Sequence, residues 1–260
     1  MSKKPLILIS NDDGITSKGI RTLVEVMAEI GEVVVVAPDS PQSGMGHAIT
    51  IGNTLRLDRS NQFGDLGVEA YQCSGTPADC VKLAKHHVLH DRRPDLVVSG
   101  INHGSNTSVS VLYSGTMSAA IEAALEGLPA IGFSLCDYSH DADFSHVRHW
   151  VKEITLKALA NGIPEGITLN VNFPPHKAGE VKGLKVCRQA RARWQEEFDQ
   201  RKDPAGRSYF WLVGSFVNME TGDSSDSDEW AIANGYVSLV PCTFDLTAYK
   251  TMQQIQGWGL

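Results

Sequence analysis

Apolar residues occur in short blocks along the first two thirds of the chain. Runs of this length, rich in valine and isoleucine, are typical of strands covered on both faces of a parallel sheet. The runs lie at residues 6–9, 33–36, 95–98, 130–133 and 168–173. Between them, residues 20–30 carry apolar side chains at helical spacing, and the alanine-rich stretch 117–126 is also predicted to be helical. The alternation predicts a three-layer α/β/α, Rossmann-like fold with a mainly parallel sheet.

The last third of the chain has a different pattern. Residues 209–216 and 230–246 are rich in aromatic and β-branched residues, and the pair Asn234-Gly235 is a hairpin signal between such runs. The acidic, serine-rich stretch 220–229 is predicted to be a flexible loop. We therefore expect an α/β catalytic core at 1–188 and a C-terminal extension at 189–260 that carries a β-hairpin.

Composition narrows the class of protein. Among 260 residues, 42% are hydrophobic and 20% are charged, which is ordinary for a globular protein. The net charge of −7 argues against a nucleic-acid duplex as partner. No apolar run approaches the ~18 residues of a membrane-spanning helix, and the polar residues 1–5 do not resemble a signal peptide. The five cysteines lack a CxxC pair and favour free thiols, so we expect a cytoplasmic protein.

Two adjacent carboxylates follow the first predicted strand. Asp12 and Asp13 come directly after the buried run and precede Gly14. Like charges at the end of a buried strand repel each other and lose solvation, so a positive partner is expected. A divalent cation bound by oxygen ligands is the simplest candidate, whereas a surface turn is the alternative interpretation.

Other polar residues follow neighbouring strands, at the sheet edge where open parallel sheets bind ligands. Ser43 follows the second run, and Asn102 and Asn106 follow the third. A hydroxyl, an amide oxygen and two carboxylates form a hard, all-oxygen site suited to Mg²⁺ or Mn²⁺. The helix start Ser114-Gly115-Thr116 offers free backbone N–H groups to a phosphate. Together these features predict metal-assisted hydrolysis of a phosphate ester.

Single residues have alternative interpretations. Ser43 lacks the Gly-x-Ser-x-Gly surroundings of a nucleophile, which favours metal ligation over covalent catalysis. Asn102 could instead stabilise its loop, and Ser114 could act only as a helix N-cap. His103, beside Asn102, could contact the substrate or transfer a proton. The aromatic run 209–211 is interpreted as hairpin core or subunit contact, with base stacking as the alternative.

Other functional classes fit the sequence less well. An aspartyl-phosphate enzyme needs Asp-x-Asp after the first strand, but Asn11 stands two residues before Asp13. A dinucleotide-dependent oxidoreductase needs Gly-x-Gly-x-x-Gly at this turn, which is absent. A non-catalytic nucleotide sensor that uses the same site stays open as an alternative.

Several motifs, in their order and spacing, resemble the SurE family of metal-dependent nucleotidases and acid phosphatases. The resemblance covers nearly the whole chain, and the joint pattern is specific although each motif alone is weak. The motifs are Ile9-Ser10-Asn11-Asp12-Asp13-Gly14, Ala37-Pro38-Asp39, Gln42-Ser43-Gly44, Ser74-Gly75-Thr76-Pro77, Ser99-Gly100-Ile101-Asn102-His103-Gly104-Ser105-Asn106, Tyr113-Ser114-Gly115-Thr116 and Gly235-Tyr236-Val237-Ser238-Leu239-Val240-Pro241.

The resemblance implies a role for each matching position. It implies one divalent cation, Mg²⁺ or Mn²⁺, and hydrolysis of nucleoside 5′-monophosphates, in some members also 3′-monophosphates or short polyphosphate, by a metal-activated water that Asp12 or Asp13 orients. It also implies a homodimer or homotetramer in which the C-terminal segment reaches a neighbour. The implied metal ligands are Asp12, Asp13, Ser43 and Asn102, and the implied phosphate contacts are Asn106, Ser114, Gly115 and Thr116.

The chain departs from the family pattern in one loop. Residues 40–42 are Ser-Pro-Gln, where family members often carry basic residues, and residues 45–47 are Met-Gly-His in place of small polar residues. Neither departure changes a predicted ligand. Both leave the preferred base and sugar position open.

Overall fold

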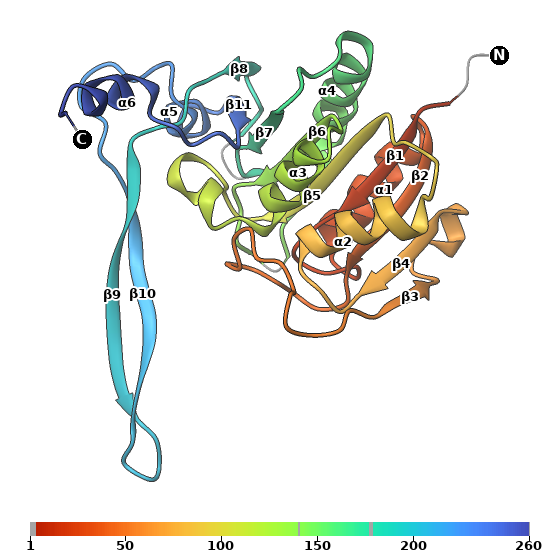
Figure 1. Ribbon diagram of the computed structural model, residues 1–260, viewed down its shortest axis with the longest axis horizontal. Coiled ribbons are helices and arrows are strands. Elements are labelled where there is room, and N and C mark those ends of the chain that lie inside the picture. The colour runs from red at the N-terminus through yellow and green to blue at the C-terminus, as the bar shows by residue number, and fades with distance from the viewer. Residues whose placement is uncertain (1–3, 140, 177–178, 260) are drawn as a thin grey trace.

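The computed structural model describes residues 4–139, 141–176 and 179–259 (Figure 1). The strands are β1 (Leu6–Ser10), β2 (Glu32–Pro38), β3 (Leu57–Ser60), β4 (Glu69–Cys73), β5 (Leu96–His103), β6 (Ala130–Leu135), β7 (Ile167–Phe173), β8 (Leu184–Val186), β9 (Ala192–Lys202), β10 (Ser208–Asn218) and β11 (Val237–Thr243). The helices are α1 (Lys18–Ala28), α2 (Pro77–Leu83), α3 (Gly115–Leu125), α4 (Arg148–Asn161), α5 (Asp228–Ala233) and α6 (Tyr249–Gln256). Short helical turns are η1 (Gly64–Leu66), η2 (Ala84–Val88), η3 (Ser108–Leu112) and η4 (Ser145–Val147).

One nine-stranded sheet organises the core. Its strand order is β3-β4-β2-β1-β5-β6-β7-β11-β8. Neighbouring strands from β4 to β7 are parallel, whereas β3 pairs antiparallel to β4 and β11 pairs antiparallel to β7. The mainly parallel α/β fold predicted from the alternating pattern is confirmed. The strand β11 belongs to this sheet although it lies within 189–260.

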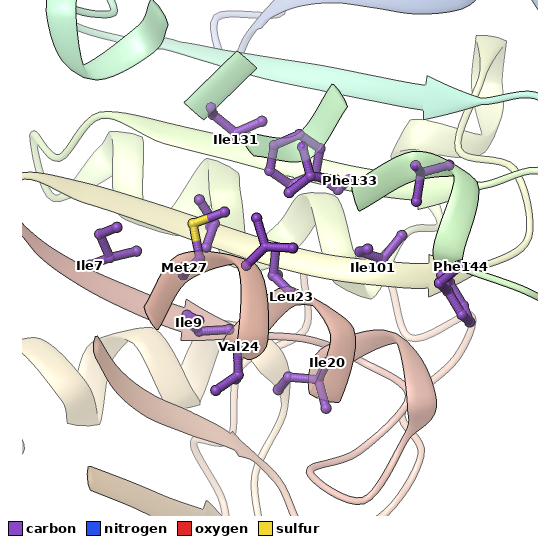
Figure 2. Packing of buried hydrophobic residues seen from close by; sticks show 14 of the residues in the cluster. Ile7, Ile9, Ile20, Leu23, Val24, Met27, Ile101, Ile131, Phe133 and Phe144 are labelled. Carbon is purple, nitrogen blue, oxygen red and sulfur yellow. The ribbon is translucent and has the colours of Figure 1, made fainter. Parts of the chain in front are cut away.

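The two faces of the sheet carry separate apolar layers. Ile7 and Ile9 point to the layer that α1 and α4 cover, and Figure 2 shows the α1 side chains lying against β1, β5 and β6. Leu6 and Leu8, the alternate residues of β1, face the layer formed by α2 and α3. Because alternate residues of one strand point to opposite faces, a continuous apolar run is needed to fill both layers.

The predicted hairpin exists, but its position was predicted wrongly. β9 and β10 pair antiparallel around a turn at 203–207, and the resulting arm extends away from the body of the molecule (Figure 1). The pair Asn234-Gly235 instead ends α5, where Gly235 has a φ of +80° before β11 begins. The backbone freedom that suits Asn-Gly to hairpin turns also suits it to helix ends, so this local signal was ambiguous.

The acidic stretch 220–229 is more ordered than its composition predicts. Its last residues, Asp228 and Glu229, open α5, and Asp228 is fully buried. Burial of this carboxylate depends on donors from distant segments, which composition does not reveal. Among the described residues, no helix is long and apolar enough to cross a membrane.

Candidate functional site

The sheet order brings three loops together at one edge. β1 lies between β2 and β5, so the segments that follow these three strands leave the sheet side by side. Asp12 and Asp13 follow β1, Ser43 follows β2, and Asn102 lies near the C-terminal end of β5 itself; these are the four residues predicted as metal ligands. Parallel pairing places all three carboxyl ends at the same edge, which is the usual ligand-binding edge of such sheets.

The turn after β1 is held by its own polar side chain. The Asn11 Nδ2 donates to the Gly14 carbonyl and to the Ser17 Oγ, both at 3.0 Å. Gly14 has a φ of +90°, a conformation that glycine adopts without strain. This turn holds the two carboxylates between β1 and the start of α1.

Asp12 lies buried against the N-terminus of α3. It is 4% exposed, and the Thr116 hydroxyl donates to its Oδ1. A side-chain Cβ at Gly115 would lie 2.6 Å from the Asp12 Cβ, so only glycine allows the helix to approach this closely. The backbone N–H of Gln42 donates to the Asp12 carbonyl at 2.7 Å, which joins the next loop to the same point.

Burial makes ionisation of both carboxylates costly. Burial, and then the charge of Asp13, raise the pKa of Asp12 to about 6, against the opposing hydrogen bond from Thr116. Burial also raises the pKa of Asp13, although the His103 backbone N–H donates to its Oδ2 at 3.1 Å. Within the described part of the chain, no ion pair involves either carboxylate. The pair therefore provides negative charge that a bound cation would stabilise.

Asn102 and Ser43 differ in how firmly the structure holds them. The buried Asn102 Nδ2 donates to the Gly104 carbonyl at 2.8 Å, so the amide oxygen does not take part in that contact and is the atom predicted to ligate a cation. Ser43 lies in an exposed loop. This loop is anchored on both sides, because Gln42 contacts Asp12 and the His47 Nε2 lies 2.8 Å from the Glu122 carboxylate on α3.

The predicted phosphate contacts lie in two segments, the start of α3 and the segment that follows β5. The Ser114 Oγ caps α3 by accepting from the Met117 N–H at 3.0 Å. Asn106 lies in a buried network: its Nδ2 donates to the Ser134 Oγ at 2.8 Å, and its backbone N–H donates to the Asn172 Oδ1 at 2.8 Å. Ser114, Gly115 and Thr116 lie beside Asp12, whereas Asn106 is held from the β6 and β7 side.

Sequence reasoning missed two supports of this edge. Asn170 and Asn172 alternate along β7, where Asn170 donates to the Asn106 carbonyl at 2.8 Å and accepts from Asn172 at 2.9 Å. Two asparagines two residues apart in a strand of mainly apolar and β-branched residues are a signal that could have identified them. Asp228 is the second support, and it binds the backbone of Ser108, two residues beyond Asn106, at 2.8 Å.

Comparison with known proteins identifies the family. The family model described as "Survival protein SurE" matches residues 7–196. The chain belongs to the SurE family. The resemblance seen in the motifs is thereby confirmed.

Relatives match along the whole chain. A protein of Cytophaga hutchinsonii named 5′-nucleotidase SurE is 71% identical over 97% of this chain and 96% of its own length. One of Christiangramia forsetii with the same name is 60% identical over 99% of this chain and 98% of its own length. The crystal structure of the SurE protein from Aquifex aeolicus superposes on this chain with a TM-score of 0.82 at 37% sequence identity. The match covers 98% of this chain and 100% of the Aquifex aeolicus chain.

Proposed function

We propose that this SurE family member is a divalent-metal-dependent 5′-nucleotidase that hydrolyses nucleoside monophosphates to nucleoside and phosphate. The observation that carries the proposal is the buried carboxylate pair, Asp12 and Asp13, set against the N-terminus of α3. This arrangement offers a cation site and an anion-binding helix start within one edge of the sheet. The names of the relatives support the nucleotide as substrate.

The donor set fits a hard cation. The described residues contain no group of three or more His, Cys, Asp and Glu side chains able to hold a metal ion. Asp12 and Asp13 with the amide oxygen of Asn102 and the hydroxyl of Ser43 nevertheless supply oxygen ligands only, which suits Mg²⁺ or Mn²⁺ completed by water. When bound, the cation would neutralise phosphoryl oxygens and lower the pKa of a water molecule.

Residues of the chain would orient the attacking water, hold the cation and bind the phosphoryl group. The Asp13 carboxylate is half-buried and lines an open cavity, so it is the better placed of the two carboxylates to orient an attacking water. The Asp12 carboxylate is fixed by Thr116 and is suited to hold the cation. The start of α3 and Asn106 would bind the phosphoryl oxygens, over which negative charge is spread in the transition state.

Phosphate release tests the proposal. Purified protein is incubated with 5′- and 3′-monophosphates of the common nucleosides, with Mg²⁺, with Mn²⁺ or with EDTA. We expect release that requires the metal and that EDTA abolishes, and the panel then reports the preferred base and sugar position. Tight nucleotide binding without release under any metal would instead establish the sensor alternative.

Gly115 provides a sharp test of the helix position. Gly115→Ala places a methyl group 2.6 Å from the Asp12 Cβ, so the helix or the carboxylate must move. A displacement of the order of 1 Å in a catalytic group is expected to lower kcat/KM at least about 10-fold. Gly52→Ala, where a Cβ meets no atom within 4 Å, is the matched control and should keep wild-type kinetics. Equal kinetics for both variants would contradict the proposed role of the α3 start.

Assembly into a homodimer or homotetramer is proposed on the basis of the hairpin arm. Large apolar side chains on β9 and β10 are exposed to solvent, including Phe198 at 66%, Leu212 at 61% and Trp211 at 58%. An isolated two-stranded hairpin is only marginally stable in water, and contiguous exposed apolar surface is typical of interfaces. The helix α6 also buries none of its residues, which suits a C-terminal segment that docks on a neighbour.

The arm can be tested by a paired substitution. Phe198 and Leu212 face each other across the strands, so Phe198→Glu with Leu212→Lys keeps a favourable cross-strand pair but makes the surface polar. We expect the mass measured by light scattering to fall to a smaller assembly or to the 28.2 kDa monomer. Gln195→Glu with Ser215→Lys alters another facing pair on the same arm and should leave the mass unchanged. An unchanged mass for the first variant would rule out this surface.

We also propose that the protein is cytoplasmic. All five cysteines are free thiols, and Cys73, Cys80 and Cys187 are buried. Reduced thiols of this kind suit a reducing compartment.

A further inference from the structure

A cavity of about 650 Å³ opens directly beside Asp13. Its walls include Thr16 and Lys18 from the start of α1, Pro41 from the loop after β2, and Tyr138 from the segment after β6. The volume lies within the range of sites that hold drug-sized ligands. Because Asp13 lines it, this space adjoins the proposed site of the cation and the phosphate.

Tyr138 forms an aromatic wall of this cavity. Its ring lies against the backbone at Gly104, where an added Cβ would be 2.4 Å from the Tyr138 Cε1. Gly104 has a φ of +107°, so glycine is doubly required at this contact. The phenol also makes a hydrogen bond with the backbone of Ser105. The ring is therefore held from one side, yet the residue is 68% exposed, which leaves aromatic surface for a ligand.

The rest of the lining is mostly polar, and it includes hydroxyl groups suited to a sugar, one ammonium group and the Asp141 carboxylate. The Thr16 hydroxyl and the Lys18 ammonium are exposed polar groups, and the Lys18 Nζ lies 3.4 Å from the Ala142 carbonyl. Pro41 adds apolar surface. A larger cavity, about 730 Å³ between α3 and the end of β11, has none of the predicted metal ligands in its lining. The cavity beside Asp13 is thus the better continuation of the phosphate site.

We propose that the cavity beside Asp13 binds the nucleoside part of the substrate, with the nucleobase stacked on the Tyr138 ring. This inference rests on the proposed nucleotidase function and specifies where that enzyme recognises its substrate. Stacking tolerates every base because each has an aromatic face, so Tyr138 favours nucleotides over base-free phosphate esters without selecting one base. Tyr138 is in this sense a specificity-determining residue.

The test compares Tyr138→Ala with Tyr138→Phe. Phosphate release is measured from AMP and from ribose 5-phosphate, and adenosine and inorganic phosphate are used as inhibitors. Loss of one base–aromatic stack is expected to raise the KM for AMP and the inhibition constant of adenosine about 10-fold in the alanine variant. The kcat for AMP, the kcat/KM for ribose 5-phosphate and the inhibition constant of phosphate should stay within about 2-fold, because these do not depend on the base. The phenylalanine variant keeps the ring and should resemble wild type.

The outcomes separate the subsite from the proposed function. An unchanged adenosine inhibition constant in Tyr138→Ala, or an equal loss with AMP and ribose 5-phosphate, would overturn the stacking role. If wild type released phosphate from no nucleotide, the proposed function would fail, and calorimetry of adenosine binding to wild type and variant would still test the subsite. Circular dichroism checks folding, and Tyr138→Leu replaces the alanine variant if that variant does not fold.

Discussion

Asp12→Asn is expected to lower the kcat for nucleoside monophosphates at least about 100-fold while the fold is kept. The loss follows because the substitution removes one of two charges that hold the cation, and preorganised charged groups act on this scale. The asparagine is isosteric and can still accept from Thr116, so the site geometry should survive. Steady-state phosphate release at saturating Mg²⁺ or Mn²⁺ measures the effect.

The same substitution should stabilise the metal-free protein. The pKa of Asp12 is raised from 3.8 to about 6 in the fold, so ionised Asp12 costs folding free energy. This cost is absent below pH 4, grows as the pH rises through the interval from 4 to 6, and is complete above it. In EDTA at pH 8, Asp12→Asn should therefore raise the free energy of unfolding by about 2–3 kcal/mol, a gain that vanishes toward pH 4.

A matched control isolates these effects. Asp58→Asn makes the same chemical change at an exposed carboxylate on β3. It should leave turnover unchanged and alter the free energy of unfolding by no more than about 0.5 kcal/mol. Near wild-type activity of Asp12→Asn would contradict the site assignment. Equal stability of wild type and variant at pH 8 would contradict the free-energy cost assigned to ionised Asp12.

Asp228→Ala is expected to lower the free energy of unfolding by about 3 kcal/mol. The carboxylate is fully buried and accepts from the backbone N–H groups of Ser108 at 2.8 Å, Ala190 at 2.9 Å and Glu229 at 2.8 Å. Each buried donor left without a partner costs about 1–3 kcal/mol. Because Ser108 follows Asn106 by two residues, kcat/KM should fall as well. Urea unfolding and phosphate release measure the two effects.

The same segment supplies the control. Asp226 lies in an ion pair with Arg188, but its side chain is 68% exposed, so Asp226→Ala should change stability by less than about 1 kcal/mol. Asp228→Asn keeps an acceptor oxygen, so its loss of stability should lie between those of Asp228→Ala and Asp226→Ala. A loss below 1 kcal/mol in Asp228→Ala would show that the hydrogen bonds of Asp228 to the backbone of Ser108 and Ala190 do not stabilise the fold.

The predicted elements of the core were read correctly from local pattern. The runs at 6–9 and 33–36 became β1 and β2, and the alanine-rich stretch 117–126 became α3. Strands that are apolar on both faces and helices with one apolar stripe follow from hydrophobic burial, which adjacent residues already encode. The binding of ligands at the carboxyl edge of parallel sheets further predicts that the candidate ligands lie near one another.

The site was predicted less completely than the core. The side chains of Asp12 and Thr116 contact each other although 104 positions separate them. The spacing of residues in the sequence therefore does not predict this hydrogen bond. Gly115 could be recognised as a helix start, but its role as the point of closest approach to Asp12 depends on how α3 packs on the sheet. Ser43 remains a predicted ligand in an exposed loop.

The sequence alone determined the class of fold and the family, because these depend on periodicity and on motifs a few residues long. The oxygen ligands stay a prediction from the same motifs. Only the tertiary structure decided the turn of the hairpin, the burial of Asp228 and the cavity walled by Tyr138. The burial of Asp228 and the position of Tyr138 depend on contacts between segments far apart in the chain, whereas the hairpin joins two adjacent strands. The free energy of such contacts comes from packing and desolvation, and these exist only once the segments have met.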